Sequence, residues 1–105
     1  MYRLTTPAHQ FTLPINTSEC QDILVTYAQG GTIVAEKHMD NGVLPEGMTL
    51  EGKKVIISLT QAETKAFSAK KATAQVRVLT LGGQAYASQY FDIEVKEVLN
   101  KDILT

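Results

Sequence analysis

The chain has no tryptophan, a single cysteine and almost no net charge, and these absences exclude several classes of protein. Its 105 residues carry 10 basic and 11 acidic side chains, for a formal net charge of -1. Binding to nucleic acid or to an anionic membrane requires clustered Lys and Arg. The only basic clusters are the pairs Lys53-Lys54 and Lys70-Lys71. We therefore expect neither nucleic acid nor a membrane as a partner.

Disulfides, signal peptides and membrane spans are also missing from the sequence. Cys20 has no second cysteine with which to pair, which is typical of a reducing compartment. The first residues contain no apolar stretch long enough for a signal peptide. No window approaches the roughly 18 apolar residues that a membrane span needs. These absences predict a soluble protein made without a secretion signal.

The chain does contain short runs in which apolar and polar residues alternate, with an apolar residue at every second position. Such a run buries one face of a strand and exposes the other. The expected strands are His9–Ile15, Ile23–Gln29, Thr32–His38, Met48–Leu50, Val55–Leu59, Ala74–Leu81 and Gln84–Leu99. The pattern predicts one all-β domain over residues 1–105, an immunoglobulin-like antiparallel β-sandwich of about seven strands. Pro7 and Pro14 lack ladder donors, which favours a sheet edge for the first strand.

Two glycine pairs predict hairpin turns, since glycine adopts positive φ without strain. A strict two-residue loop at Gly30-Gly31 would pair Tyr27 with Val34, but it would set other apolar residues of one strand opposite polar residues of the next. A longer loop or a bulge is therefore expected there. A strict two-residue loop at Gly82-Gly83 places Leu79 opposite Tyr86.

One segment departs from the alternation. Thr60 and Glu63 have the spacing of a capping box, in which each side chain binds the backbone amide of the other residue. We expect a short helix over Gln61–Phe67 that crosses from one sheet to the other. Ala62, Ala66 and Phe67 are expected to face the core.

No set of side chains has the spacing of a catalytic, cofactor or metal site. His9 and His38 have no third ligand nearby in the sequence, and Cys20 lies among acidic residues, which raise a thiol pKa. We therefore predict no catalytic residue, no cofactor and no metal. An enzyme built on Cys20 or the histidines is the least favoured interpretation.

The last expected hairpin carries the candidate interaction residues. If Val76 and Val78 face the core, an outer stripe is formed by Leu79, Leu81, Tyr86 and Tyr90, with Ser88 among them. Exposed apolar stripes are typical of protein contact surfaces. Two alternatives remain open: scattered surface apolar residues are common, and a bulge near Gln89 could turn some of the stripe inward.

Several segments resemble a group of small proteins encoded by phages and prophages of Gram-positive bacteria. The similar segments are Thr6–Pro14, Val25–Gln29, Leu59–Thr64 with Phe67, Val76–Thr80 with Gly83, and Val98–Asn100. The resemblance implies a β-sandwich that serves as a virion or tail-associated structural component. The chain is also similar to the immunoglobulin-like domain of some phage baseplate proteins, but only in its expected fold.

Together these observations predict a non-enzymatic subunit or accessory protein of a phage or prophage particle, of tail or baseplate type. Its expected partners are further copies of itself, in a homo-oligomer, or other phage structural proteins. Its expected location is the virion, or the host cytoplasm during assembly. The alternative is a carbohydrate-binding module for host cell-surface glycans, in which Tyr86, Ser88 and Tyr90 contact the sugar.

Overall fold

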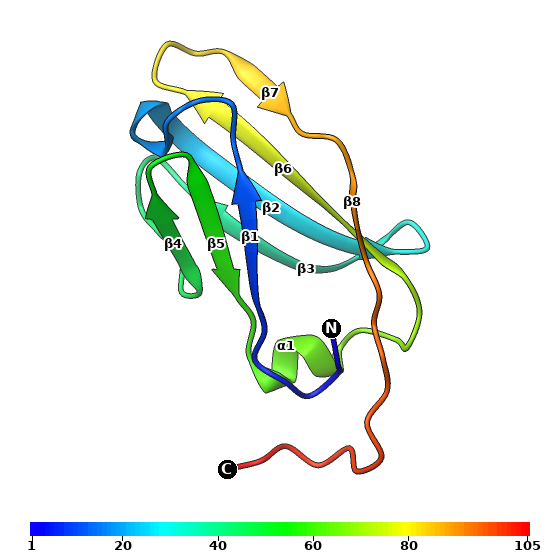
Figure 1. The fold of residues 1–105 in the computed structure, drawn as a ribbon. Helices are drawn as coiled ribbons and strands as arrows, with labels where there is room; N and C mark the ends of the chain where they lie inside the picture. Colours follow the sequence, from blue (N-terminus) through cyan, green and yellow to red (C-terminus); the bar gives the residue numbers. More distant parts are fainter.

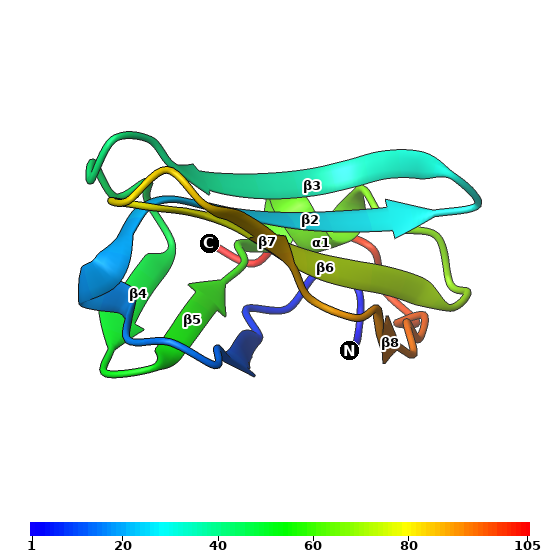
Figure 2. The same ribbon diagram turned by 90° about the horizontal axis from the view of Figure 1, so that it is seen from above.

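Two antiparallel sheets form the molecule in a computed structural model that describes residues 1–105. In chain order, the elements are β1 (Ala8–Thr12), the 3-10 turn η1 (Thr17–Glu19), β2 (Cys20–Gln29), β3 (Thr32–Met39), β4 (Met48–Glu51), β5 (Lys54–Ser58), α1 (Gln61–Lys65), β6 (Ala72–Thr80), β7 (Ala85–Ala87) and β8 (Phe91–Ile93). One sheet has the order β1-β5-β4, and the other has the order β3-β2-β6-β7, with β8 also paired to β6 (Figure 1). Figure 2 shows the two layers facing each other. The predicted antiparallel sandwich is confirmed, and so is the edge position of the first strand.

The strand order also follows the immunoglobulin arrangement without its first strand. The sheet β1-β5-β4 corresponds to strands B-E-D, and the sheet β3-β2-β6-β7 corresponds to strands C′-C-F-G. The structure has eight strands because the expected closing strand over Gln84–Leu99 is interrupted after Ala87 and resumes at Phe91 as a separate strand.

The core lies between the sheets and follows the period of two seen in the sequence. Along β2, Ile23, Val25 and Tyr27 are fully buried, and Val55 and Ile57 of β5 face them from the other sheet. Strands with alternating burial stabilise a sandwich by removing apolar area from water at about 25 cal/mol per Å². Both sheets thus contribute to one cluster of buried side chains.

The β2–β3 hairpin has the irregularity that its sequence predicts. Gly30 and Gly31 form a two-residue turn, with φ of 57° and 82°, between the paired residues Gln29 and Thr32. The register then shifts between Tyr27 and Ala28. The extra residue is Val34 of β3, so the bulge changes which residues of β3 lie opposite the buried residues of β2, as the parity argument requires.

The helix crosses between the sheets as predicted, but it is shorter and a different residue faces inward. Both hydrogen bonds of the capping box are present. Ala62 and Ala66 are exposed, so their predicted inward orientation is wrong, while Phe67 and Thr64 are buried. Threonine is suited to this place because its hydroxyl donates to the Thr5 carbonyl over 3.0 Å and accepts from the Thr5 amide over 3.1 Å. The helix is thereby tied to the segment before β1.

Candidate functional site

The β6–β7 hairpin determines which predicted interaction residues lie together, and its register is displaced by one residue. Val78 is opposite Tyr86, where Leu79 is predicted. The loop contains residues 81–83 rather than the glycine pair alone. A slip of one residue moves a side chain to the other face of a sheet. The prediction of one shared outer stripe is therefore wrong.

The five predicted residues are accordingly divided among different surfaces. Tyr86 shares the core-facing side of its sheet with Val78, and it is 49% exposed because β7 lies at the edge. Leu79 lies on the outer face, where it lines a shallow hollow with Leu24. Tyr90 is 71% exposed in the segment between β7 and β8 and lines a separate hollow with residues of β2.

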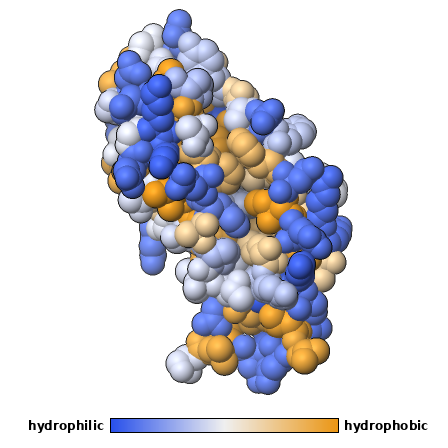
Figure 3. Space-filling model, viewed as in Figure 1, coloured by the Kyte–Doolittle hydropathy of each residue, from blue (hydrophilic) through white to orange (hydrophobic).

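An apolar groove lies between the end of β1 and the edge strand β7, and we call it the interaction groove. Its volume is about 300 Å³, and its walls are residues 12–15, Val76, Val78 and residues 86–88. An adjoining hollow of about 430 Å³ shares Ile15 and Tyr86 with it and extends to Leu81. Hydrophobic side chains are visible in this region of the space-filling view (Figure 3). Leu81, Tyr86 and Ser88 therefore border one surface, together with residues 13–15, which sequence reasoning missed.

The interaction groove is open because the segment after β1 is held by the β4–β5 turn. The Leu13 amide donates to the Lys53 carbonyl over 2.7 Å. The Thr17 amide and hydroxyl both donate to the Gly52 carbonyl, over 2.8 and 2.7 Å. No hydrogen bond joins residues 13–17 to β7. Since β1 and β7 are each the last strand of their sheet, both walls of the groove end in an unpaired strand edge.

Ser88 supports the sheet at the point where the closing strand is interrupted. Its hydroxyl accepts from the Val76 amide over 2.9 Å and donates to the Gln89 carbonyl over 2.8 Å, and its own amide donates to the Val76 carbonyl over 2.8 Å. The serine side chain thereby replaces a ladder partner of β6 and leaves Gln89 exposed. The irregularity predicted near Gln89 is a break in the strand.

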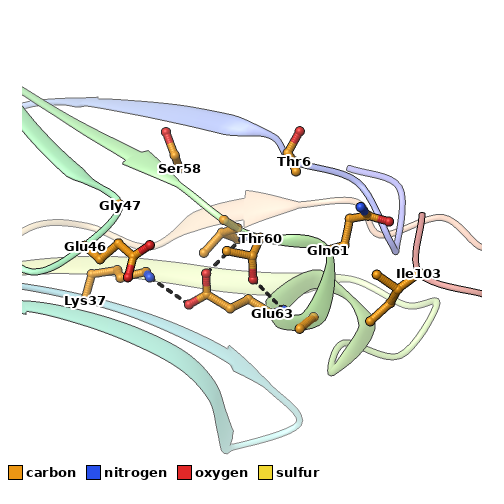
Figure 4. Close-up of a pocket in the computed structure, with 11 residues that line it drawn as sticks. Thr6, Lys37, Glu46, Gly47, Ser58, Thr60, Gln61, Glu63 and Ile103 are labelled. Carbon is orange, nitrogen blue, oxygen red and sulfur yellow. Dashed lines mark hydrogen bonds and ion pairs between the residues drawn. The ribbon is translucent and has the colours of Figure 1, made fainter. Parts of the chain in front are cut away.

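A second, polar groove of about 730 Å³ lies at the start of α1 (Figure 4). Lys37 Nζ lies 2.7 Å from Glu63 Oε2, and Glu63 also completes the helix cap with Thr60. Burial acts to raise the pKa of Glu63, but the hydrogen bonds from Lys37 and Thr60 lower it below its ordinary value of 4.5. The lysine and the glutamate form an ion pair that joins β3 to α1 in this groove, and their charges neutralise each other.

The side chains with potential chemistry are engaged in structural contacts. His9 Nδ1 lies 2.8 Å from Tyr27 Oη, and burial lowers the pKa of His9 below 6.5, with a smaller contribution from the Met1 ammonium group. Cys20 is buried, and burial followed by the charge of Glu19 raises the pKa of its thiol. The thiolate is the reactive form, so this cysteine is a weak nucleophile.

The register of the β2–β3 hairpin also brings together three potential metal ligands that their spacing in the sequence did not indicate. Ligand atoms of Asp22, His38 and Asp40 lie within 4.8 Å of one another. His38 Nε2 is 2.9 Å from Asp22 Oδ2, and the other carboxylate oxygen of Asp22 accepts from the Asn41 amide over 3.2 Å. A hydrogen bond and a turn account for these contacts. The group could offer one imidazole and two carboxylates to a divalent cation.

Comparisons with family models, curated proteins and solved structures find no match to this chain. No helix has the length and apolar character required to span a membrane.

Proposed function

We propose that the chain is a non-enzymatic structural subunit that assembles with further copies of itself through the interaction groove, as part of a phage or prophage particle. The observation that carries this proposal is the groove itself, an apolar hollow between two unpaired strand edges. Unpaired edges add strands from other chains, and contiguous exposed apolar surface is typical of interfaces. Tyr86 at its rim is of a residue type enriched among interface residues that dominate binding. The particle context is supported by the sequence resemblance alone.

The non-enzymatic part of the proposal is supported by the pairing of the reactive groups. His9 is bonded to Tyr27, His38 to Asp22, and Lys37 to Glu63. A catalytic site needs a nucleophile or base beside an open hollow and aimed into it. The interaction groove contains no titratable side chain except the Tyr86 phenol, which donates to Gln84 over 2.9 Å.

Glycan binding is the alternative function, and it depends on exposed aromatic faces. Tyr90 is 71% exposed and lines a hollow of about 280 Å³ with Thr26 and Gln75, which could provide hydrogen bonds to a sugar. Tyr86 lines a different hollow, so the hollow at Tyr90 offers a sugar only one aromatic face. We favour self-assembly for this reason. Loss of cell-wall glycan binding in Tyr90→Ala would support the alternative.

The proposal is tested by measuring the mass of the protein by light scattering over a concentration series. We expect an oligomer in the wild type and a monomer in Tyr86→Ala. Leu79→Ala is the matched control, because Leu79 belongs to the same hairpin but lies on the opposite face, and we expect it to remain an oligomer. A wild type that is monomeric at every concentration would overturn self-assembly. Loss of the oligomer in Leu79→Ala alone would assign the contact to the outer face.

A further inference from the structure

The last residues of the chain carry three exposed apolar side chains, of which only Ile103 lines a hollow of its own copy, the polar groove at α1. Leu99, Ile103 and Leu104 are 107%, 43% and 78% exposed. Residues 98–105, which we call the tail, contain no strand or helix and run below the body of the molecule (Figure 1). Hydrophobic side chains gather at this end of the space-filling view (Figure 3). Exposed apolar residues so close together indicate a contact that the isolated chain does not make.

The tail is attached to the body by backbone contacts more than by side-chain packing. The Gln61 amide group donates to the Leu104 carbonyl and accepts from the Leu104 amide, both over 2.8 Å. A side-chain amide that satisfies both groups of one residue imitates the pairing of a neighbouring strand. A strand added from another chain could replace Gln61 as the partner of Leu104.

The root of the tail is fixed at the α1 end of the molecule. The Lys96 amide donates to the Met1 carbonyl over 2.8 Å, and the Arg3 amide donates to the Lys96 carbonyl over 2.9 Å. Arg3 also binds the Glu97 carboxylate over 2.6 Å and the Lys65 carbonyl at the end of α1 over 2.8 Å. Residues beyond Glu97 therefore start from this end.

The interaction groove lies toward the opposite end, beside β7 and the β1–β2 connection (Figure 1). In the structure, the tail runs away from this groove, past α1 to the far end of the molecule (Figure 1). We therefore place the tail in the groove of a neighbouring copy.

An extended tail would place apolar side chains against both walls of the groove. One wall of the groove is formed by residues 13–15 after β1, and the other by Val78 and Tyr86 of the second sheet. Successive side chains of an extended segment point in opposite directions. Ile103 and Leu104 would therefore contact one wall each, while the backbone between them follows the unpaired edge of β1 or β7.

The charges beside the groove also match those of the tail. Lys54 is opposite Thr12 in the β1–β5 pairing, and Lys53 is its neighbour; both are exposed and neither forms an ion pair. In the tail, Lys101 is paired with Glu97 over 3.8 Å, which leaves Asp102 as the unpaired charge. An acidic residue next to the two apolar anchors would meet a basic rim.

We propose that the tail of one copy inserts into the interaction groove of the next, with Ile103 and Leu104 as the anchors. This inference depends on the proposed function and names the contact that it uses. Two different surfaces meet in such a contact, so it is heterologous and adds copies head to tail into a ring or an open filament.

The test combines two variants that each disable one side of the contact. The tail variant is Ile103→Ser with Leu104→Ser, and the groove variant is Tyr86→Ser. We expect each to be monomeric alone by light scattering. When they are mixed, the intact tail of the groove variant can enter the intact groove of the tail variant, so we expect a 1:1 heterodimer of twice the monomer mass and nothing larger.

A synthetic peptide of residues 97–105, labelled with a fluorophore, provides a second measurement. We expect saturable binding to the tail variant, and binding about tenfold weaker or lost in a protein that also carries Tyr86→Ser, as for removal of an anchor residue. The tail residues are exposed, so their replacement leaves folding intact, which circular dichroism checks.

Three outcomes would overturn the inference, and they differ in what they mean for the proposed function. If the tail variant keeps the wild-type mass while Tyr86→Ser is monomeric, another part of the neighbour fills the groove and the proposed function stands. If the mixture contains monomers only while each variant alone has lost the oligomer, the tail and the groove act in separate contacts. If neither variant changes the mass, both proposals fail.

Discussion

The two ends of the sandwich have similar apolar residues but are completed differently. At the end beside α1, the Tyr27 ring lies 5.9 Å from that of Phe67 and 5.6 Å from that of His9, measured between centroids. We call this the closed end. At the other end, Tyr86 is half exposed beside the interaction groove. Aromatic residues therefore seal one end and border an opening at the other.

The difference comes from the segments that connect the sheets. Between β5 and β6, the chain passes through α1 and places Phe67, which is 1% exposed, beneath the crossing. Between β1 and β2, the chain is bonded to the β4–β5 turn and leaves β7 uncovered. An alternating strand pattern creates two apolar faces, and a connecting segment that covers their end is what closes the core.

The largest contrast that we expect is between Phe67→Ala at the closed end and Tyr86→Ala at the interaction groove. Removing the buried ring should lower the free energy of unfolding by about 3–5 kcal/mol, from lost burial and the cavity that remains. Removing the half-exposed Tyr86 ring should cost about 1 kcal/mol or less. Urea unfolding measures both, at a protein concentration below that of assembly, where the wild type and both variants are monomeric. Equal losses would mean that Tyr86 belongs to the packed core and that the groove is no opening.

A second contrast compares Gly47 with Gly83, which have the same φ of 84°. It separates the loss of stability caused by steric crowding from the loss caused by backbone conformation. A Cβ on Gly47, beside the polar groove of Figure 4, would lie 2.5 Å from the Ser58 carbonyl oxygen, whereas a Cβ on Gly83 in the β6–β7 loop would have no atom within 4 Å. Gly83→Ala should cost about 1–2 kcal/mol for the positive φ alone. Gly47→Ala adds the steric conflict, for a total of about 3 kcal/mol.

Thermal unfolding of the two variants in parallel checks this difference. Each variant is the control for the other, because both replace a hydrogen with a methyl group at positive φ. A Gly47→Ala variant as stable as Gly83→Ala would show that the strand β4 can move away from β5, and that the closed end is less tightly packed than its distances indicate.

Local rules were enough to predict most of the strands, the start of the helix, the bulge and the burial of Phe67. The spacing of Thr60 and Glu63 predicts the helix start, and parity around Gly30-Gly31 predicts the bulge, since each depends on residues close together in the chain. Helical spacing within the same segment predicts that Phe67 faces the core beneath the crossover. These signals are short-range, so the sequence carries them directly.

The open end could not be predicted in the same way. A glycine pair suits either a two- or a three-residue loop, and the choice made at Leu81 decides on which face Tyr86 lies. The groove also depends on the hydrogen bond from Leu13 to Lys53, residues far apart in the sequence. The pairing of Asp22 with His38 has the same origin. Contacts between distant segments leave no spacing that a single sequence reveals.

The smallest effect that we expect is a pH dependence that arises at the closed end, from His9. Its lowered pKa means that the unfolded chain takes up a proton near the ordinary value of 6.5, while the folded chain does so only at lower pH. The free energy of unfolding is therefore constant above pH 6.5 and falls as the pH drops from 6.5 to the folded pKa.

His9→Gln, which keeps a hydrogen-bonding partner for Tyr27, should remove this decline when unfolding is measured by urea titration at each pH. The lowered pKa of Glu63 has the same sign below pH 4.5, so a decline there should remain in His9→Gln and serves as the internal control. A variant that still loses stability between pH 6.5 and 4.5 would show that protonation acts elsewhere, and the closed end would then be no more sensitive to acid than the interaction groove.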